Sequence, residues 1–271
     1  MNPLTKALLA LAITHAPPAR SPFSLEPMPA CGSDPAAPTC ELEPVCAEPN
    51  LSCRPPHYSK ALKTWVRYES RESAVRRYAE IAEAIATTAG SLMKCKDESC
   101  EQLTWPGGTR TLALATLTVA LHESGLREDV QIGRTRGSAG EACLVQVMPE
   151  QAPYYASWLP EPERELTAKD PKLREQFAQT LVGRSPEALS RCFEVGMRML
   201  ARARLACGSH PKGWQWGTFS MYGTGNHCSS PQVGATRSRT FEILLSTEPR
   251  LRPADAALVG LTEPPPSGGE V

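Results

Sequence analysis

Leu112 to Leu121 carries no charged residue and almost no polar face. Such a pattern predicts a helix that is buried on all sides, because a helix at the surface shows a polar stripe. The run ends at Glu123, and Ser124 and Gly125 follow it. Glycine just past the last helical residue is the usual left-handed stop. We therefore expect a buried helix whose last turn carries Glu123.

Other segments show helical spacing or helix-capping residues. Apolar residues recur every three or four positions from Tyr58 to Ala89, and Gly90 is the expected stop. Asp170 before Pro171, and Ser185 before Pro186, are typical helix starts. The predicted helices cover residues 58–89, 171–181, 185–207 and 236–246.

The chain divides by composition. Residues 17–56 are dense in proline and show neither helical nor alternating spacing, which indicates a linker or an arm stapled by disulfides. We assign residues 23–56 to this Pro/Cys-rich arm, residues 57–250 to one mainly α domain, and residues 251–271 to a flexible C-terminal tail.

The first residues have the features of an export signal, which we assign to residues 1–22. Lys6 precedes an apolar run from Ala7 to Ile13, and small residues ending at Ala16 follow. An alternative is a lipoprotein in which Cys31 is acylated. No other stretch is apolar and long enough to span a bilayer. We expect an exported protein, periplasmic or extracellular, without an integral membrane span.

Charge and cysteine content narrow the class of protein. The 29 basic and 29 acidic side chains cancel, so no overall field favours nucleic acid or an anionic membrane. The ten cysteines lack zinc-type spacing and indicate disulfides formed in an oxidising compartment. No metal and no cofactor are implied.

The cysteine pairing stays open at this stage. Cys192 and Cys207 lie about 22 Å apart along one helix, so they cannot bond to each other. Each needs Cys143, Cys228 or another partner, or stays free. As a working hypothesis we pair Cys207 with Cys228 and Cys143 with Cys192.

Glu123 is the candidate for acid chemistry. The negative end of the helix dipole and the apolar neighbours should both raise the pKa of its carboxyl group. A carboxyl group that is protonated near neutral pH can act as a general acid. The alternative is a structural carboxylate in a salt bridge with Arg127 or another arginine.

Four short motifs give this picture a family resemblance. Residues 122–126 (HESGL) resemble the E-S-x-x motif of the lytic transglycosylases of the lysozyme superfamily, and residues 143–149 (CLVQVMP) are similar to their G-L-M-Q-x-M-P motif. Residues 193–200 resemble the helix motif in which glycine precedes a hydrophobic pair, and residues 221–225 (MYGTG) resemble A-Y-N-x-G. The family order is kept over roughly 110 residues. Cys143 and Gly223 depart from the pattern, where the family has Gly and Asn.

The resemblance implies a fold and a reaction. The fold would be a mainly α, lysozyme-like domain with a buried central helix ending in the catalytic Glu123, and with a short β-hairpin over residues 127–141 as one wall of the cleft. The reaction would cleave the bond between N-acetylmuramic acid and N-acetylglucosamine in peptidoglycan, leaving an anhydro sugar. Glycan strands are the implied partner, and a cell-envelope or secretion apparatus is a further candidate.

The resemblance also assigns residues to the site. Glu123 would serve first as acid and then as base. Gln146 would bind substrate near the cleaved bond, with Met148 in the same motif. Tyr222 would hydrogen-bond and orient the Glu123 carboxyl group, and Ser124 would help to stabilise the oxocarbenium-like centre.

Three alternatives remain open. Hydrolysis of the same bond would need a second carboxylate, for which Glu128, Asp129 and Glu141 are candidates. A cysteine peptidase or amidase would use Cys143 with His122 or His227. A non-catalytic glycan-binding or assembly protein would keep the fold after losing substrate contacts.

Two packing questions also stand. Tyr154, Tyr155 and Trp158 could stack on sugar rings or pack an inserted segment onto the body, and we favour packing. Gly196 inside a helix predicts the close approach of another segment, with the helix that bears Glu123 as the candidate.

Overall fold

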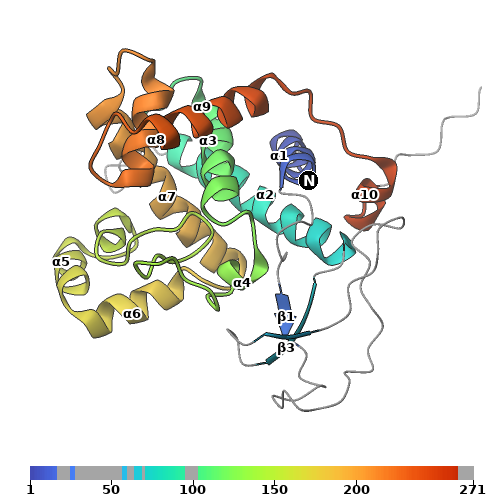
Figure 1. Ribbon diagram of the computed structural model, residues 1–271, viewed down its shortest axis with the longest axis horizontal. Coiled ribbons are helices and arrows are strands. Elements are labelled where there is room, and N and C mark those ends of the chain that lie inside the picture. The colour runs from blue at the N-terminus through green and yellow to red at the C-terminus, as the bar shows by residue number, and fades with distance from the viewer. Residues whose placement is uncertain (17–24, 28–56, 60–63, 69–70, 95–102, 262–271) are drawn as a thin grey trace, which may run out of the picture.

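The structure is a computed structural model that describes residues 1–16, 25–27, 57–59, 64–68, 71–94 and 103–261. This part of the chain is mainly helical (Figure 1). Its α-helices are α1 (Pro3–His15), α2 (Arg71–Lys94), α3 (Gly108–Glu123), α4 (Glu128–Gln131), α5 (Glu161–Lys169), α6 (Pro171–Thr180), α7 (Pro186–Cys207), α8 (Trp214–Thr224), α9 (Pro231–Ser246) and α10 (Pro253–Leu258). A short 3-10 helix, η2, covers Ala152–Tyr155.

The predicted central helix is confirmed as α3. Every residue from Leu112 to Ala120 is buried, and α1, α2, α7 and α9 all contact this helix. Figure 1 shows α3 in the middle of these helices, while α5 and α6 lie to one side. The apolar core of the domain is therefore built around α3.

The predicted start of the first long helix is wrong. Residues Leu25–Pro27, His57–Ser59 and Thr64–Tyr68 form the strands β1, β2 and β3 of an antiparallel sheet with the order β1-β3-β2. Leu25 pairs with Tyr68, and His57 pairs with Val66. The sequence Thr-Trp-Val-Arg-Tyr of β3 is rich in β-branched and aromatic residues, which favour strands. The helix starts only at Arg71.

The other helix predictions were closer. α2 runs through Gly90 to Lys94, so Gly90 is not its stop. Asp170 caps α6, because its carboxylate accepts hydrogen bonds from the backbone N–H groups of Lys172 and Leu173 at 2.7 and 3.2 Å. Ser185 caps α7 in the same way. The helix predicted from Thr236 begins earlier, at Pro231.

Part of the predicted flexible tail is folded. Residues Pro253–Leu258 form α10, and the Asp255 carboxylate, of which 3% is exposed, pairs with Arg71 at 2.9 Å and with Arg252 at 3.1 Å. Because Arg71 begins α2, this ion pair anchors α10 at the start of α2, where Figure 1 draws it. Residues 262–271 lie outside the described residues.

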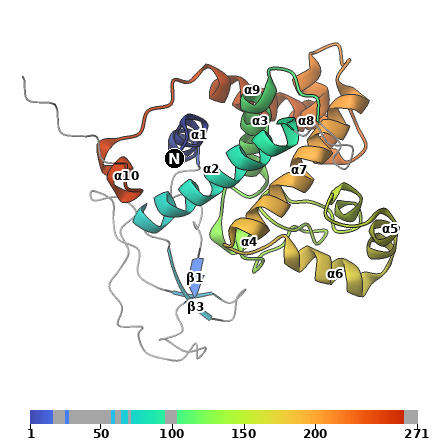
Figure 2. The same cartoon turned by 180° about the vertical axis from the view of Figure 1, so that it is seen from behind.

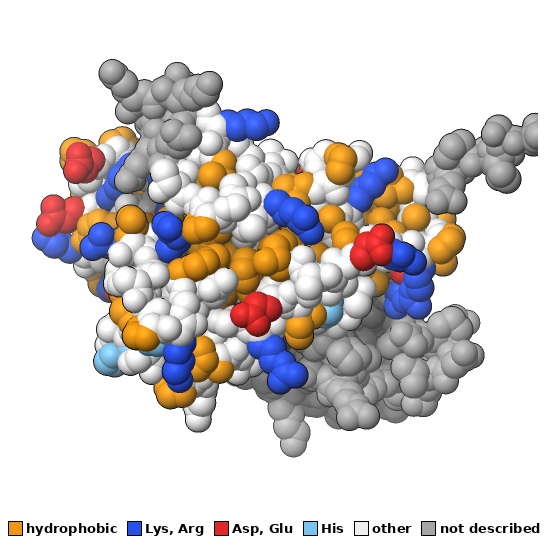
Figure 3. All heavy atoms as spheres, turned by 90° about the horizontal axis from the view of Figure 1, so that it is seen from above, with side chains coloured by type: hydrophobic (Ala, Val, Ile, Leu, Met, Phe, Trp, Pro, Cys, Tyr) orange, Lys and Arg blue, Asp and Glu red, His pale blue; other side chains and the backbone are white. Residues whose placement is uncertain are grey.

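α9 has one buried and one exposed side. Arg237, Phe241 and Leu244 are buried, whereas Ile243 and Leu245 are 42% and 41% exposed. Figure 3 looks down on the face of the molecule where α9 lies, and hydrophobic side chains gather there in a band. The buried side of α9 faces α3 and α8, since both helices contact it and Phe241 packs against Phe219 of α8.

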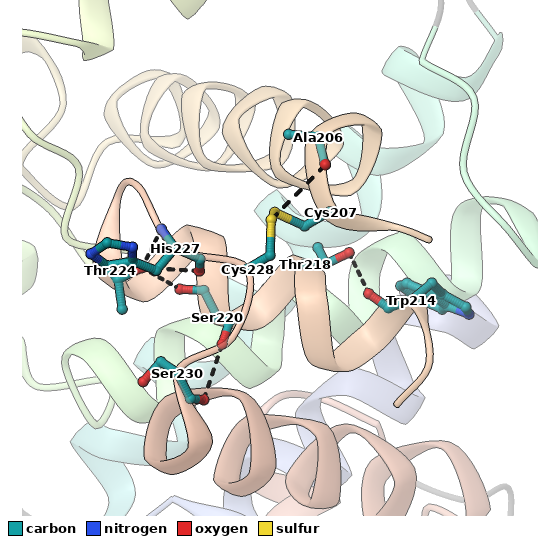
Figure 4. Close-up of a disulfide and its surroundings, with 9 residues drawn as sticks. All are labelled: Ala206, Cys207, Trp214, Thr218, Ser220, Thr224, His227, Cys228 and Ser230. Carbon is teal, nitrogen blue, oxygen red and sulfur yellow. Dashed lines mark hydrogen bonds between the residues drawn. A yellow bond between two sulfur atoms is a disulfide. The ribbon is translucent and has the colours of Figure 1, made fainter. Parts of the chain in front are cut away.

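One disulfide joins the end of α7 to the loop between α8 and α9. Cys207 and Cys228 are bonded, as the working hypothesis proposed, and Figure 4 shows the bridge beside α8. The Ser220 hydroxyl in α8 donates to the Ser230 carbonyl at 3.0 Å, just before α9 begins. The bridge and this hydrogen bond connect the consecutive helices α7, α8 and α9.

The cysteines at positions 31, 40, 46, 53, 95 and 100 lie outside the described residues, and so does the lipoprotein alternative at Cys31.

The N-terminal segment that we assigned to an export signal is part of the core. In α1, Leu8, Leu9, Leu11 and Ala12 are at most 2% exposed and belong to the same apolar cluster as α3. The Thr5 hydroxyl donates to the Glu83 carboxylate in α2 at 2.7 Å. Figure 2 shows α1 beside α2, seen from behind, and the two helices are in contact. Cleavage after Ala16 would therefore uncover apolar surface on α2 and α3.

We predict that Leu9→Ala lowers the free energy of unfolding by about 2–5 kcal/mol, because it removes a buried side chain and leaves a cavity. Lys6→Ala, an exposed position on the same helix, is the control and should change it by at most about 0.5 kcal/mol. Urea denaturation of the full chain measures both. Equal effects of the two substitutions would show that α1 is not part of the folded core.

Candidate active site

α3 carries Glu123 to the boundary of the core. The hydroxyl groups of Thr116 and Thr118, buried within α3, donate to the carbonyls of Leu112 and Leu114 at 2.9 Å each, so these polar atoms are satisfied inside the helix. Glu123 is the last residue of α3, and its side chain is 20% exposed. The helix thus places one carboxylate between a dry interior and solvent.

The turn after Glu123 has the predicted left-handed form, with Gly125 at φ 60° and Leu126 at φ 55°. The Ser124 hydroxyl donates to the Ala120 carbonyl at 2.8 Å and accepts from the Leu126 N–H at 3.2 Å. Ser124 is 6% exposed. These contacts make Ser124 a helix cap, and they do not support its predicted role at the substrate.

A buried arginine fixes the segment that follows. Arg77 of α2, only 2% exposed, donates to the Leu126 carbonyl and to the Gln131 side-chain oxygen.

The predicted hairpin over residues 127–141 is wrong, because this segment forms α4 and turns. A single β-bridge joins Ala142 to Val147 just beyond it. Residues 137–140 form a β-turn, with a Gly140 N–H to Gly137 carbonyl bond of 3.0 Å, and no strands flank it.

The Glu123 carboxylate pairs with Arg237 of α9 at 2.6 Å. Burial raises the pKa of Glu123 above its usual value, the Arg237 guanidinium opposes this rise, and the Glu141 carboxylate adds to it. The predicted rise in pKa is therefore present, with burial as its main cause. The arginine that pairs with Glu123 is Arg237, whereas Arg127 pairs with Asp129.

Tyr222 lies beside Glu123 but does not hydrogen-bond to it. Its hydroxyl donates to the Val145 carbonyl at 2.8 Å. A phenol has one proton to donate, so the predicted hydrogen bond from Tyr222 to the Glu123 carboxylate is not formed in this structure. Burial raises the pKa of Tyr222, and the Glu123 charge raises it further. Tyr222 therefore stays protonated next to the carboxylate.

The segment 142–148, which we call the site loop, is a tight turn. Ala142 and Val147 exchange two backbone hydrogen bonds at 3.0 and 2.9 Å. Gln146 adopts φ 50°, and its side-chain amide donates to the Cys143 carbonyl at 2.8 Å. Met148 is half-buried at the end of the loop, and its carbonyl accepts two hydrogen bonds that begin η2. Hydrogen bonds within the loop therefore help to hold its shape.

Two contacts attach the site loop to α7. Cys143 and Cys192 form a disulfide, as the working hypothesis proposed. Gly196 admits the loop, because a Cβ atom there would lie 2.7 Å from Cγ2 of Val145. The close neighbour of Gly196 is therefore Val145, and the prediction that α3 packs there is wrong. The disulfide also removes the thiol that a Cys143 peptidase would need.

The three candidates for a second carboxylate occupy different surroundings. Glu128 pairs with Arg184. Asp129 accepts hydrogen bonds from Arg127 and Thr135 that hold its pKa below the usual value, although burial acts in the opposite direction. Only Glu141, of these three, acts electrostatically on Glu123. A Cβ atom on Gly137 would touch both the Glu141 carboxylate and the Gln146 amide, so these two side chains converge over Gly137.

The aromatic residues of the 150s pack the body rather than forming a stacking platform. Trp158 is stacked on Phe177 of α6, with ring centroids 5.9 Å apart, and the Arg191 guanidinium covers the ring at 5.4 Å. Tyr155 packs partly buried against the core. Tyr154 is 48% exposed. Packing is therefore confirmed for Trp158 and Tyr155.

Sequence reasoning did not identify Arg237. Its signal was present, because Gly234, Arg237, Phe241 and Leu244 share the buried face of α9. An arginine on an apolar stripe needs a charged or polar partner, since burying a lone charge is costly. That partner is Glu123.

Comparison of the chain with family models, with curated proteins and with solved structures found no match in any of the three. Among the described residues, no helix has the length and apolar character to cross a membrane. The same residues contain no group of three or more His, Cys, Asp or Glu side chains that could hold a metal ion.

We predict that the variant Cys143→Ala/Cys192→Ala loosens the site loop, because it removes the covalent connection of the loop to α7. Its stability should fall by about 2–5 kcal/mol. Hydrogen–deuterium exchange at Ala142 and Val147 should accelerate in this variant and change little in the control Cys207→Ala/Cys228→Ala. Unchanged exchange at both amides would contradict the anchoring role of the bridge.

Proposed function

We propose that this chain is a lysozyme-like lytic transglycosylase that cleaves the bond between N-acetylmuramic acid and N-acetylglucosamine in peptidoglycan, with Glu123 as general acid and base. The proposal starts from the resemblance of four motifs, and one structural observation carries it further. All four motifs meet at the site loop and Glu123, although they are spread over roughly 110 residues.

The convergence is physical at each step. Val145 of the second motif packs on Gly196 of the third motif. Cys143 of the second motif is bonded to Cys192, which directly precedes the third motif in α7. Tyr222 of the fourth motif donates to the Val145 carbonyl and feels the charge of Glu123 in the first. Chance matches to four short patterns would have no reason to gather at one loop and the carboxylate near it.

In the first step Glu123 would act as the acid. Its raised pKa increases the fraction of the carboxyl group that is protonated and able to donate. The proton goes to the glycosidic oxygen, the bond from this oxygen to the muramic acid anomeric carbon breaks, and positive charge develops on that carbon. Glu123 is left ionised, where Arg237 can pair with it.

In the second step the Glu123 carboxylate would act as the base. It takes the proton of the muramic acid hydroxymethyl group while the oxygen of that group bonds to the anomeric carbon. The product is a 1,6-anhydro sugar, no water is consumed, and Glu123 is protonated again. One carboxyl group therefore suffices for both steps.

The proposed location is outside the cytoplasm. The two disulfides, Cys143–Cys192 and Cys207–Cys228, fit an oxidising compartment. Peptidoglycan lies in such a compartment, so substrate and redox environment agree. The proposal does not depend on removal of the N-terminal helix.

We predict that Glu123→Gln lowers the rate of glycan cleavage by about 10²–10⁴-fold, because the amide cannot donate a proton to the leaving oxygen. Glu242→Gln, at an exposed position of α9, is the matched control and should retain activity. Mass spectrometry of digested peptidoglycan measures the products, and we expect anhydromuramyl ends from the wild type.

Cleavage by neither wild type nor control would reject the enzymatic proposal and favour a non-catalytic glycan-binding or assembly role. Equal cleavage by the wild type and Glu123→Gln would assign the reaction to another residue.

A lysozyme-type hydrolase is the second candidate, and the position of Glu141 favours it. Its charge acts on Glu123 from the site-loop side, while its carboxylate accepts only one hydrogen bond from a described group, the Ala139 N–H at 2.9 Å. A carboxylate with spare lone pairs near the acid could hold a water molecule.

We predict that Glu141→Gln leaves the formation of anhydromuramyl ends intact, because the leading mechanism needs one carboxyl group. If the wild type instead makes reducing ends and Glu141→Gln abolishes them, the enzyme is a hydrolase that uses Glu141. Glu150→Gln, an exposed neighbour of the site loop, controls for the lost charge.

A further inference from the structure

Arg237 is the least expected residue of the site. It projects from the buried face of α9, its side chain is 10% exposed, and one of its terminal nitrogens, Nη2, lies 2.6 Å from the Glu123 carboxylate. The other, Nη1, is buried and has no hydrogen-bond partner among the described residues. Arg237 thus binds Glu123 with one side of its guanidinium, and the other side is left to packing.

Gly223 of α8 packs against the second terminal nitrogen of Arg237, Nη1. A Cβ atom on Gly223 would lie 2.4 Å from Arg237 Nη1, 2.8 Å from its Cζ, and 2.6 Å from Cγ1 of Val233. Contacts below 3.0 Å are not tolerated without movement, so any side chain at position 223 would have to displace the guanidinium. The absence of a side chain at 223 therefore leaves the space that the guanidinium of Arg237 occupies while it pairs with Glu123.

This explains one departure from the resembled motif. Where that motif has Asn, the chain has Gly223, and the space is filled by an arginine that comes from the next helix. The substitution removes a polar side chain from α8 and allows a charged one from α9 to reach the same place. The loss at position 223 and the presence of Arg237 are coupled by sterics.

We propose that Gly223 and Arg237 form a matched pair, in which Gly223 admits the guanidinium and Arg237 acts as a positioning residue that orients the Glu123 carboxylate and sets its proton affinity. The role in turnover rests on the proposed function. The effect on proton affinity does not, because it belongs to the free protein.

Three charged or titratable groups interact with Glu123, which are Arg237 from α9, Tyr222 from α8 and Glu141 from the segment before the site loop. His122 precedes Glu123 on α3 and lies near Arg237. Burial and Arg237 both lower the pKa of His122, so it is neutral at pH 7 and adds no charge there. Tyr222 is protonated. Among these groups, Arg237 is thus the one that stabilises the ionised carboxylate.

The sign of the effect follows. An opposite charge favours the ionised form of an acid, so removing Arg237 should raise the pKa of Glu123 by about 1 unit or more. Glu123 must be protonated to act as an acid, and activity is lost as the pH rises through its pKa. The alkaline limb of the pH profile should therefore move to higher pH without Arg237.

The direct test is a carbon-13 NMR titration of the glutamate carboxyl groups in the full chain without substrate. Glu123 is assigned from the resonance missing in Glu123→Gln. We expect Arg237→Gln and Gly223→Ala both to raise the pKa of Glu123 by about 1 unit or more, and Arg237→Lys, which keeps the charge, to restore most of the wild-type value. Arg239→Gln, an exposed charge two residues along α9, is the control and should leave the pKa unchanged.

The double variant Gly223→Ala/Arg237→Gln separates coupling from coincidence. If the methyl group at 223 acts by displacing the guanidinium, the double variant should have the same pKa as Arg237→Gln alone. Two additive shifts would overturn the matched pair, and a Glu123 pKa that moves no more in Arg237→Gln than in Arg239→Gln would overturn the role of Arg237. Near-ultraviolet circular dichroism verifies that each variant is folded, and Gly223→Ala keeps the test available if Arg237→Gln unfolds.

A second readout separates this inference from the proposed function. If the titration gives the expected shifts but neither the wild type nor any variant cleaves glycan, the matched pair stands and the transglycosylase proposal fails. If cleavage occurs, the alkaline limb of kcat/KM should move with the measured pKa of Glu123.

Discussion

The burial of α3 is the constraint on which the other elements depend. Leu112 to Ala120 offers no polar face, so the chain can satisfy this helix only by surrounding it, and α1, α2, α7 and α9 do so. The fully buried stretch must end where a charge appears, because an ionised carboxylate is costly in an apolar interior. Glu123 is therefore held at the edge of the core, and its raised pKa is a consequence of the burial that folds the domain.

The rest of the site is assembled by connections between segments that are distant in sequence. The site loop is attached to α7 by a disulfide and by the contact of Val145 with Gly196, and to α8 by the Tyr222 hydroxyl. α9 is attached to the end of α3 by the Arg237 ion pair and by His122, whose Nε2 lies 2.8 Å from the Thr240 hydroxyl. Each connection uses a rigid element, so the carboxylate has fixed neighbours.

The sequence predicted what local pattern determines and missed what depends on packing. The uncharged run of α3, the Asp170 cap of α6 and the Ser185 cap of α7 carry their signal in adjacent residues. Strand β3 was mistaken for helix because its apolar residues continue the stripe of α2, although tertiary pairing decides the strand. Composition alone cannot separate an export signal from an apolar helix that packs in a core, so the packing of α1 became visible only in the structure. Arg237 could be assigned to the site only when α9 was placed against α3.

A helix-end carboxylate paired with an arginine also fits a purely structural role, and the protein supplies its own comparison. The structural carboxylates Asp129 and Asp255 are each 3% exposed and accept hydrogen bonds or ion pairs from at least two groups. Glu123 is 20% exposed, has a single arginine partner whose other terminal nitrogen lacks a hydrogen bond, and lies near the like charge of Glu141. Such an arrangement is poor for stability. It suits a group that must exchange a proton with a ligand, and perturbed carboxylates of this kind concentrate at functional sites.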